Sequence, residues 1–356
     1  MVSLLAYPRR LFVSGNSPSR RVARAVFRRL RFVIFQLLGV MLLTFVLIRL
    51  VPGDPARVIA GPAATPSVLQ AIRKSLGLDQ PLPVQFYHYL GNVLHGNLGT
   101  SILTGHTVIS DLASRLPATL ELITSALIIS LVLGVTFGLI LARRRARVVN
   151  SGTFVYSMLA GAIPDFWLGL LLIYFFTFKL KLTPAPIGRL GFQSAPPHVT
   201  GFLIIDSLIA GDFSTLWSAI QHLILPVATL VVVYTGQIIK ITRLSTEAAD
   251  KSSFVDLYDG FGVEQRLVRR RATRLAMPPV LTISGITYGY LLGGAVLVET
   301  VFAWGGVGQY AVNAVRSADY PAIQGFVLLA ATFNIVVYLV VDVLLLIVDP
   351  RISRAR

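Results

Sequence analysis

Long apolar runs alternate with polar segments along the whole chain, and the runs predict six membrane-spanning helices. They cover residues 32–50, 117–142, 152–178, 222–243, 279–302 and 323–348. At a rise of 1.5 Å per residue, each run can cross a hydrocarbon layer about 30 Å thick, the longer ones with some tilt. The pattern therefore predicts an all-α, polytopic membrane protein.

The segments that connect these runs alternate between rich and poor in basic residues. Residues 1–31 contain eight arginines and no acidic residue, four arginines fall within residues 143–147, and eight basic residues lie within residues 240–274. The connecting segments that alternate with these contain few basic residues. They are residues 51–116, 179–221 and 303–322. Because Lys and Arg are retained on the cytoplasmic side, both termini are predicted to be cytoplasmic. The membrane is then an inner membrane or a plasma membrane.

This topology divides the chain into two parts. Residues 1–27 are expected to form a basic cytoplasmic extension, and residues 28–356 a transmembrane domain. Within that domain the largest extracytoplasmic loop is residues 51–116, and the largest cytoplasmic loop is residues 244–278. Loops longer than about 15 residues are usually functional, so both are candidates for docking other proteins.

Composition narrows the possible chemistry. The net charge of +16 would suggest nucleic acid in a soluble chain, but with 54% hydrophobic and only 13% charged residues it reflects cytoplasmic loops that face anionic lipid. The chain has no cysteine, and its five histidines show no metal-ligand spacing, so no metal site is expected. No segment matches the phosphate-binding loop G-x-x-x-x-G-K-[ST]. We therefore expect no catalytic residue and no cofactor in this chain.

The cytoplasmic segment between the fourth and fifth runs is neither a simple linker nor a domain. Phe254, Leu257, Tyr258 and Phe261 follow the spacing i, i+3, i+4, i+7, which predicts a short helix with one apolar face. A helix of this length is marginal alone, so its apolar face is expected to pack on another protein. The helix should end at a left-handed turn at Gly262, and a second helix should follow and end at Pro278-Pro279.

Ionisable residues inside apolar runs are candidate functional groups, because placing them in lipid is costly. Arg49, Glu121 and Glu299 fall near the outer ends of their predicted spans. They form a charge cluster in which Arg49 pairs with one of the two glutamates, or Arg49 extends its side chain to the membrane interface, and both interpretations stay open. Asp165 has two interpretations that stay open. It lines a passage within the membrane, or it lies in the first turn of a new helix that begins after Pro164.

Two spans contain the small-residue motif G-x-x-x-G. Gly134 and Gly138 form it in the second span, and Gly285 and Gly289 form it in the fifth. This spacing lets two helix backbones approach closely. We expect the motif to serve packing within the subunit, with a dimer interface as the alternative.

The cytoplasmic loop resembles the coupling loop of ABC importer permeases, in which the sequence E-A-A is followed after three residues by glycine. Here Asp256, Leu257 and Tyr258 stand in place of E-A-A, and Gly262 is the glycine. Other segments are similar to the first permease subunit of dipeptide and oligopeptide importers. They are Arg49–Pro55, Leu76–Pro81, Gly96–Ser101, Arg115–Leu122, Pro164–Gly169, Glu299–Trp304, Asp319–Pro321 and Asp349–Ile352.

The resemblance implies a heterodimer with a second permease, two cytoplasmic ATPase subunits or one fused ATPase that bind ATP and Mg²⁺, and an extracytoplasmic peptide-binding protein. It implies import of dipeptides or oligopeptides by alternating access. The residues implied in coupling are Phe254, Asp256, Leu257, Tyr258, Asp259, Phe261, Gly262 and Val263. Nickel chelates or glutathione are alternative substrates within the family. A proton-coupled secondary transporter is the alternative from another class, and it would be expected to show internal repeats and carboxylates at the membrane midplane.

Overall fold

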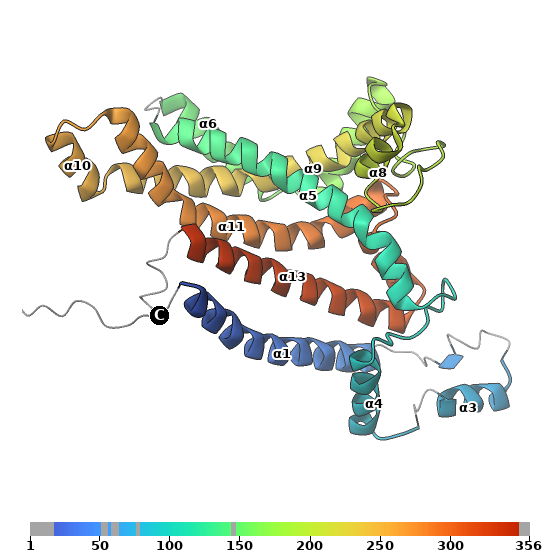
Figure 1. The fold of residues 1–356 in the computed structure, drawn as a ribbon. Helices are drawn as coiled ribbons and strands as arrows, with labels where there is room; N and C mark the ends of the chain where they lie inside the picture. The colour runs from blue at the N-terminus through green and yellow to red at the C-terminus, as the bar shows by residue number, and fades with distance from the viewer. Residues whose placement is uncertain (1–17, 51–55, 58–63, 76–78, 144–146, 349–356) are drawn as a thin grey trace, which may run out of the picture.

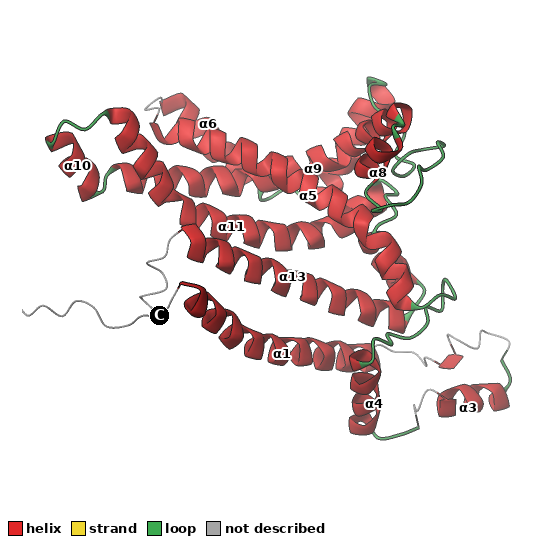
Figure 2. Ribbon diagram, in the orientation of Figure 1, coloured by secondary structure: helices red, strands yellow, loops and turns green. Residues whose placement is uncertain are grey.

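A computed structural model describes residues 18–50, 56–57, 64–75, 79–143 and 147–348. Within these residues the chain is built of helices and loops, and no strand is assigned (Figure 2). The Asp349–Ile352 motif lies outside the described residues. The expected boundary after residue 27 falls inside the first helix, α1 (Pro18–Leu50).

Long helices running side by side form the body of the molecule (Figure 1). Their bounds are α1 (Pro18–Leu50), α5 (Val108–Arg143), α9 (Phe213–Asp250), α11 (Gln265–Val301) and α13 (Tyr320–Val348). Among the described residues, α5, α9, α11 and α13 are each long and apolar enough to cross a membrane, and α1 contributes the shorter apolar stretch Phe32–Leu47. The protein is therefore a helical, multi-pass membrane protein.

Four of these helices, α1, α5, α9 and α11, extend well past the predicted spans. The span expected to start at Pro117 begins at Val108, and α11 runs through Pro278 and Pro279 instead of ending there. A proline inside a helix removes one backbone hydrogen bond but does not have to end the helix when packing holds both sides. Around Pro117 that packing comes from Val108 and Leu112, which are buried in one hydrophobic cluster with α12 (Val307–Arg316). The predicted end of a helix at Pro278-Pro279 is wrong.

The predicted third span, residues 152–178, is not one continuous α-helix. It consists of α6 (Arg147–Ala160), a break, α7 (Asp165–Leu172) and the π-helical turns η1 (Ile173–Lys179). Pro164 stands directly before α7 with extended backbone dihedrals, φ −65° and ψ 133°. This geometry is the one that a proline favours just ahead of a helix.

The core lies between α5, α7, α9 and α11, and α5 packs closely on α9 in it. A Cβ atom on Gly134 would lie 2.5 Å from Ile238 Cγ2, and one on Gly138 would lie 2.5 Å from Thr242 Cβ. On the other side of α11, the second glycine motif meets Val341 and Asn334 of α13. Both G-x-x-x-G motifs therefore pack helices of one subunit, as expected.

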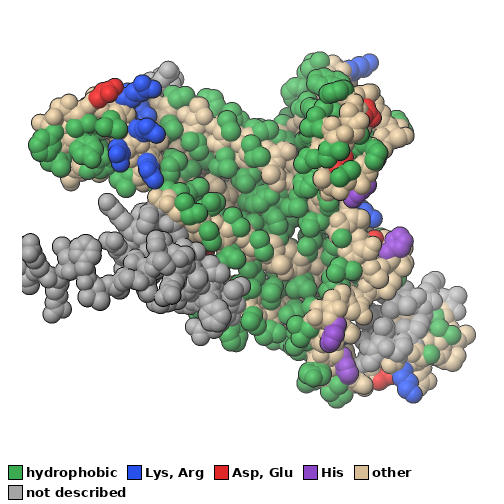
Figure 3. Space-filling model, viewed as in Figure 1, with side chains coloured by type: hydrophobic (Ala, Val, Ile, Leu, Met, Phe, Trp, Pro, Cys, Tyr) green, Lys and Arg blue, Asp and Glu red, His purple; other side chains and the backbone are tan. Residues whose placement is uncertain are grey.

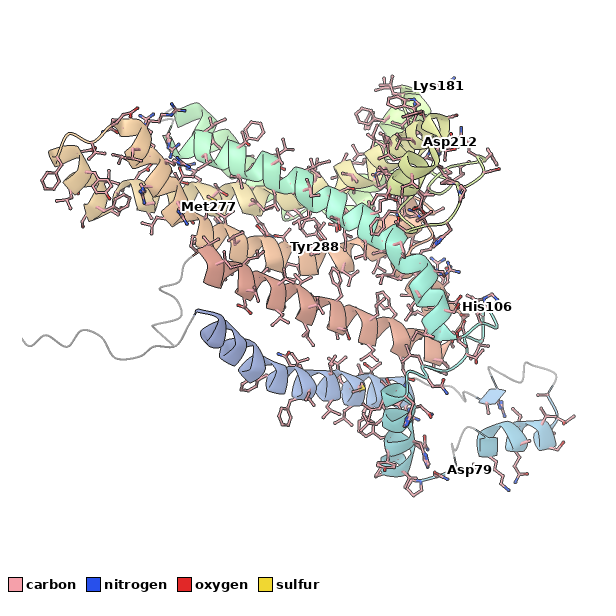
Figure 4. The ribbon with its side chains drawn as sticks, in the orientation of Figure 1. Asp79, His106, Lys181, Asp212, Met277 and Tyr288 are labelled. Carbon is pink, nitrogen blue, oxygen red and sulfur yellow. The ribbon has the colours of Figure 1, made fainter. Side chains whose placement is uncertain are left out.

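Short helices close the two ends of the bundle. One end carries α10 (Ser253–Gly260), together with the start of α1 and the end of α13 (Figure 1). The opposite end carries α3 (Pro66–Ser75), α4 (Leu82–Leu94), α8 (Leu203–Ala210) and α12. In the side-chain view, Met277 lies at the α10 end, and Lys181 and Asp212 lie at the opposite end (Figure 4).

Replacing a helical glycine by alanine usually raises stability, but the close packing at Gly138 predicts that it lowers stability there. Gly138→Ala should lower the unfolding free energy of the purified protein by about 1–3 kcal/mol, because the added methyl group overlaps Thr242. Gly39→Ala on α1, where nothing lies within 4 Å of the new Cβ, should leave stability unchanged or raise it by about 0.5–1 kcal/mol through helix propensity. Thermal unfolding in detergent measures both. Equal shifts would show that α5 and α9 are not tightly packed at Gly138.

Candidate functional site

The loop between α9 and α11 forms a compact projection at one end of the bundle. α9 ends at Asp250 and α10 begins at Ser253, so only two residues separate the two helices. Phe254 and Val255 pack against a small buried cluster of Ala249, Ala272 and Ala276. The first turn of α10 is thus attached to the ends of the two long helices.

The turn after α10 has a defined C-capping geometry. Gly262 has φ +68°, in the left-handed region. The Val263 N–H donates to the Tyr258 carbonyl at 3.0 Å, and the Gly262 N–H donates to the Asp259 carbonyl at 3.0 Å. This pair of bonds is the Schellman motif, in which the left-handed residue is usually glycine. The predicted role of Gly262 as a left-handed turn is confirmed.

The four residues of the predicted apolar face do not share one environment. Leu257 is 56% exposed and Phe261 is 76% exposed, whereas Phe254 is partly buried against the helix ends. Tyr258 packs edge-on against Phe254, with ring centroids 5.8 Å apart. The outward apolar surface is therefore Leu257 with Phe261, which we call the α10 tip.

Charged side chains lie near the α10 tip, with the acidic ones on α10 and the basic ones on the next helix. Asp256 and Asp259 are exposed on α10, and Asp259 accepts a hydrogen bond from Gln265 Nε2 at 2.7 Å. The next helix begins with exposed arginines, and basic side chains gather at this end of the molecule (Figure 3). They are Arg266, Arg269, Arg270, Arg271 and Arg274. An acidic and apolar tip thus lies beside a basic helix start.

Arg143 fastens the base of this projection. It is the last residue of α5, its Nε lies 3.8 Å from the Asp250 carboxylate on α9, and its Nη2 donates to Thr273 Oγ1 on α11 at 2.7 Å. One side chain thus joins the ends of three long helices at the α10 end of the bundle.

At the opposite end, Glu121 of α5 is the centre of a second group of polar contacts. Arg189 forms an ion pair with Glu121, and the backbone N–H of Ile204 donates to Glu121 Oε1 at 2.9 Å. Arg189 also donates to the Gly201 carbonyl at 3.2 Å. The long segment before α8 is thereby attached to α5.

Glu299 belongs to the same region but is held by neutral donors. Its side chain is fully buried, at 0% exposure, and it accepts hydrogen bonds from Thr119 Oγ1 and, at 3.0 Å, from the backbone N–H of Gln309. Trp304 Nε1 donates to the Ala118 carbonyl at 2.9 Å. We call Glu121, Glu299, Arg189, Thr119 and Trp304 the outer cluster. Two motifs quoted from the sequence, 115–122 and 299–304, meet in it.

Arg49 does not belong to the outer cluster. Its guanidinium donates to Gln85 Oε1 on α4, at 3.1 Å and 2.8 Å, and stacks 3.4 Å from the ring centroid of Phe45. The predicted pairing of Arg49 with Glu121 or Glu299 is wrong in this structure. The outer end of α1 packs on α4, and a sequence cannot say which of several helix ends are neighbours.

Asp165 is the first residue of α7, so the interpretation as a helix start is confirmed. Its Oδ2 accepts a hydrogen bond from Tyr234 Oη at 3.1 Å, and the pair lies against Gly294 of α11. A carboxylate in the first turn of a helix is electrostatically favourable.

Comparison with known proteins identifies the family. The profile of the binding-protein-dependent transport system inner membrane component matches residues 134–354, and the N-terminal profile of the same kind of protein matches residues 22–124. The chain belongs to this family. It is a permease subunit of an ABC importer and not itself an enzyme, since ATP hydrolysis belongs to partner ATPases.

Named relatives cover nearly the whole chain. The probable D,D-dipeptide transport system permease protein DdpB of Escherichia coli is 40% identical over 89% of this chain and 93% of its own length. The di/tripeptide transport system permease protein DppB of Pseudomonas aeruginosa is 38% identical over 92% and 98%. The dipeptide permease DppB of Escherichia coli is 34% identical over 93% and 99%. Membership of this family sets aside the alternative of a proton-coupled secondary transporter.

Several residues of these sites were not found from the sequence. Arg189 and Tyr234, the partners of Glu121 and Asp165, lie 68 and 69 residues away from them along the chain. Asp319 is fully buried and accepts from Ser101 Oγ at 2.6 Å, which joins two quoted motifs 218 residues apart. Asp319 lies in the quoted segment Asp319–Pro321, so the resemblance to known permeases could have drawn attention to it. Arg189 lies in none of the quoted segments, and no pattern in the sequence pointed to it.

Asp206 is another acid that only the structure explains. Burial disfavours its charged form, but hydrogen bonds from Thr200, Gly201 and Val199 outweigh this effect and hold the pKa of Asp206 below its ordinary value. The Thr200 N–H and Oγ1 each lie 2.7 Å from Asp206 Oδ1. These contacts give the segment before α8 a fixed shape.

The outer cluster predicts coupling between Arg189 and Glu121. Arg189→Met should lower the unfolding free energy by about 3 kcal/mol, because it leaves a buried carboxylate without its cation, and Glu121→Gln in the same chain should recover part of the loss. The matched control is Arg49→Met with Glu121→Gln, for which the two effects should add. Thermal unfolding of the single and double variants measures the coupling. If the changes in unfolding free energy of the two single variants simply added in the double variant, Arg189 and Glu121 would not stabilise each other.

Proposed function

We propose that this chain is one half of a heterodimeric permease that imports dipeptides and short oligopeptides. A binding protein would deliver the peptide outside, and two ATPase subunits or one fused ATPase, with bound ATP and Mg²⁺, would drive alternating access from inside. The observation that carries this proposal is that relatives named as dipeptide or di/tripeptide permeases match the chain over about nine tenths of its length. Membership of the binding-protein-dependent family supports the same set of partners.

The proposed topology has six crossings with both termini in the cytoplasm, and α6 with α7 and η1 forms the broken third crossing. The Lys and Arg distribution supports this orientation. The arrangement of the helices supports it too, because the start of α1, the end of α13 and α10 all lie at one end (Figure 1). A chain whose first and last spans both have their terminal ends on one side makes an even number of crossings.

The proposed coupling mechanism begins at the α10 tip. Leu257 and Phe261 would insert into an apolar groove on an ATPase subunit, and the acidic groups beside them would meet basic residues at its edge. Closing and opening of the ATPase pair would then move α10. Arg143 would pass this movement to α5, α9 and α11 together. The passage would open alternately to the two sides of the membrane.

A transport assay tests the function directly. The complete complex, reconstituted in vesicles with its binding protein outside and ATP inside, should accumulate a labelled dipeptide. Accumulation should stop when ATP or the binding protein is left out. Uptake of a nickel chelate in place of the dipeptide would contradict the proposed substrate class.

Two glycine substitutions in the coupling loop test whether the turn after α10 is needed for ATP hydrolysis. Gly262→Val should reduce binding-protein-stimulated ATP hydrolysis about tenfold, because a left-handed backbone costs an ordinary residue about 1–2 kcal/mol. Gly260→Val is the control, since Gly260 is helical and nothing lies within 4 Å of the new Cβ. The measurement is ATPase activity of the purified complex. Equal activities would mean that the turn at Gly262 is not needed for coupling.

The α10 tip makes a separate prediction about assembly. Phe261→Asp should weaken binding of the ATPase subunits by about 2 kcal/mol, because it places a charge in an apolar contact. Phe192→Asp is the matched control, because Phe192 is 99% exposed and precedes α8 at the opposite end. Co-purification of ATPase with permease measures the effect. Full retention of the ATPases by Phe261→Asp would show that the tip does not dock them.

The topology is tested by labelling single cysteines, which is clean because the chain has none of its own. Asn97→Cys and Ser317→Cys should react with a membrane-impermeant reagent added to spheroplasts. Asp259→Cys should react only after the membrane is opened. Labelling of Asp259→Cys from outside would invert the proposed orientation.

A further inference from the structure

Asp165 lies at the one break that interrupts a crossing segment of the described bundle, about halfway through it. Its partner Tyr234 is 21 residues from the start of α9 and 16 from its end, or about 31 Å and 24 Å at 1.5 Å per residue. The residues before it, Gly161, Ala162 and Pro164, are exposed and outside any helix. The carboxylate and this irregular backbone thus share one level of the bundle.

The contacts of Asp165 are poor compared with those of the other buried acids. It accepts one side-chain hydrogen bond, from the neutral Tyr234, and one from its own backbone N–H, and no ion pair among the described residues includes it. Glu121 has Arg189 and a backbone N–H, and Asp206 has donors from three residues. A carboxylate has about four acceptor sites, so most of those of Asp165 have no side-chain donor.

Asp165 and the irregular backbone before it would be unstable in contact with lipid hydrocarbon. An acid at the centre of a spanning helix costs about 2.5–3.5 kcal/mol even on insertion scales, and backbone outside a helix is tolerated in a membrane only where it is covered by protein or borders water. The side chain of Asp165 is only half-buried in this chain. The face formed by the start of α7, Tyr234 and Gly294 therefore needs water or a partner protein around it, as a passage between the two proposed permease subunits would provide.

Gly294 preserves the space for this pair. A Cβ atom at this position would collide with both the Asp165 carboxylate and the Tyr234 hydroxyl. The neighbouring Gly293 has nothing within 4 Å of its own Cβ position. The Asp165 carboxylate and the Tyr234 hydroxyl thus pack directly on the backbone of α11 at Gly294, and any side chain at this position would displace them.

We propose that Asp165 binds the α-ammonium group of the peptide as it crosses the membrane. This inference rests on the proposed import function and names a contact within it. Every peptide with a free amino terminus carries this cation whatever its side chains, and its pKa is about 7.7–8.0. An ammonium group offers three donors to the acceptor sites that Tyr234 leaves unused. Tyr234 is a positioning residue: its hydroxyl orients the Asp165 carboxylate, and only the carboxylate binds the ammonium group.

The test compares Asp165→Asn and Asp165→Glu with the unaltered complex, with the same binding protein in every assay. Because delivery is unchanged, a difference in dipeptide uptake arises after the peptide leaves the binding protein. At roughly pH 6.5, where the α-amino group is protonated, Asp165→Asn should lower kcat/KM for uptake about tenfold. Asp165→Glu should retain most of the uptake. Tyr234→Phe should have the smaller effect of a lost orienting hydrogen bond.

The pH dependence separates recognition from a structural role. The ratio of uptake by the unaltered complex to uptake by Asp165→Asn should fall toward one at roughly pH 9, where the peptide has lost its amino-terminal charge. The effects of pH on the ATPases and on the binding protein cancel in this ratio. Binding-protein-stimulated ATP hydrolysis by Asp165→Asn should stay at the level of the unaltered complex.

Two results would overturn the inference. Equal uptake by Asp165→Asn and the unaltered complex at every pH would show that the carboxylate does not meet the peptide. A loss that is the same at every pH, accompanied by loss of stimulated ATP hydrolysis and not restored by Asp165→Glu, would make Asp165 a structural residue. The proposed function fails separately, if the unaltered complex takes up no peptide.

Discussion

The close approach of α5 and α9 is the constraint on which the rest of the structure depends. Gly134 and Gly138 remove the side chains that would separate the two helices, and Ile238 and Thr242 fill the space. In a membrane the hydrophobic effect does not draw helices together, so contact over small residues supplies much of the association energy. α7 and α11 complete the core around this pair.

Both candidate sites are attached to the ends of this core. Arg143 joins α5, α9 and α11 at the α10 end, and the outer cluster joins α5, α11 and the segment before α8 at the other. A displacement of the α10 tip by an ATPase would therefore act on helices whose far ends hold the outer loops. Helices that are closely packed move as units because their interfaces do not deform continuously. This arrangement suits a subunit that must respond on one side of the membrane to events on the other.

The break before α7 is the exception to this regular packing. Elsewhere prolines are accommodated inside long helices, at Pro117, Pro226, Pro278 and Pro279. Pro164 instead follows three residues outside any helix and precedes Asp165, whose carboxylate is bound by Tyr234. An irregular segment inside a membrane protein needs water or protein around it. Its presence near the middle of the bundle is what makes this face a candidate lining of the passage.

The sequence by itself determined the class of protein, the helical character and the short helix and turn between the fourth and fifth predicted spans. Apolar runs of sufficient length allow only membrane helices, and glycine after a short amphipathic helix requires the left-handed turn seen at Gly262. The local patterns also placed α10 and assigned Gly134 and Gly138 to close packing. These features depend on residues near one another in the chain, so a local pattern contains them.

Tertiary structure alone decided which distant groups meet and where helices end. It paired Glu121 with Arg189 instead of Arg49, gave Asp165 the single partner Tyr234, and turned Phe254 inward while leaving Phe261 exposed. It also carried α11 through two prolines, because packing on both sides outweighs two missing hydrogen bonds. Each outcome depends on which helices are neighbours, and that is fixed by the sum of many weak contacts between segments far apart in sequence.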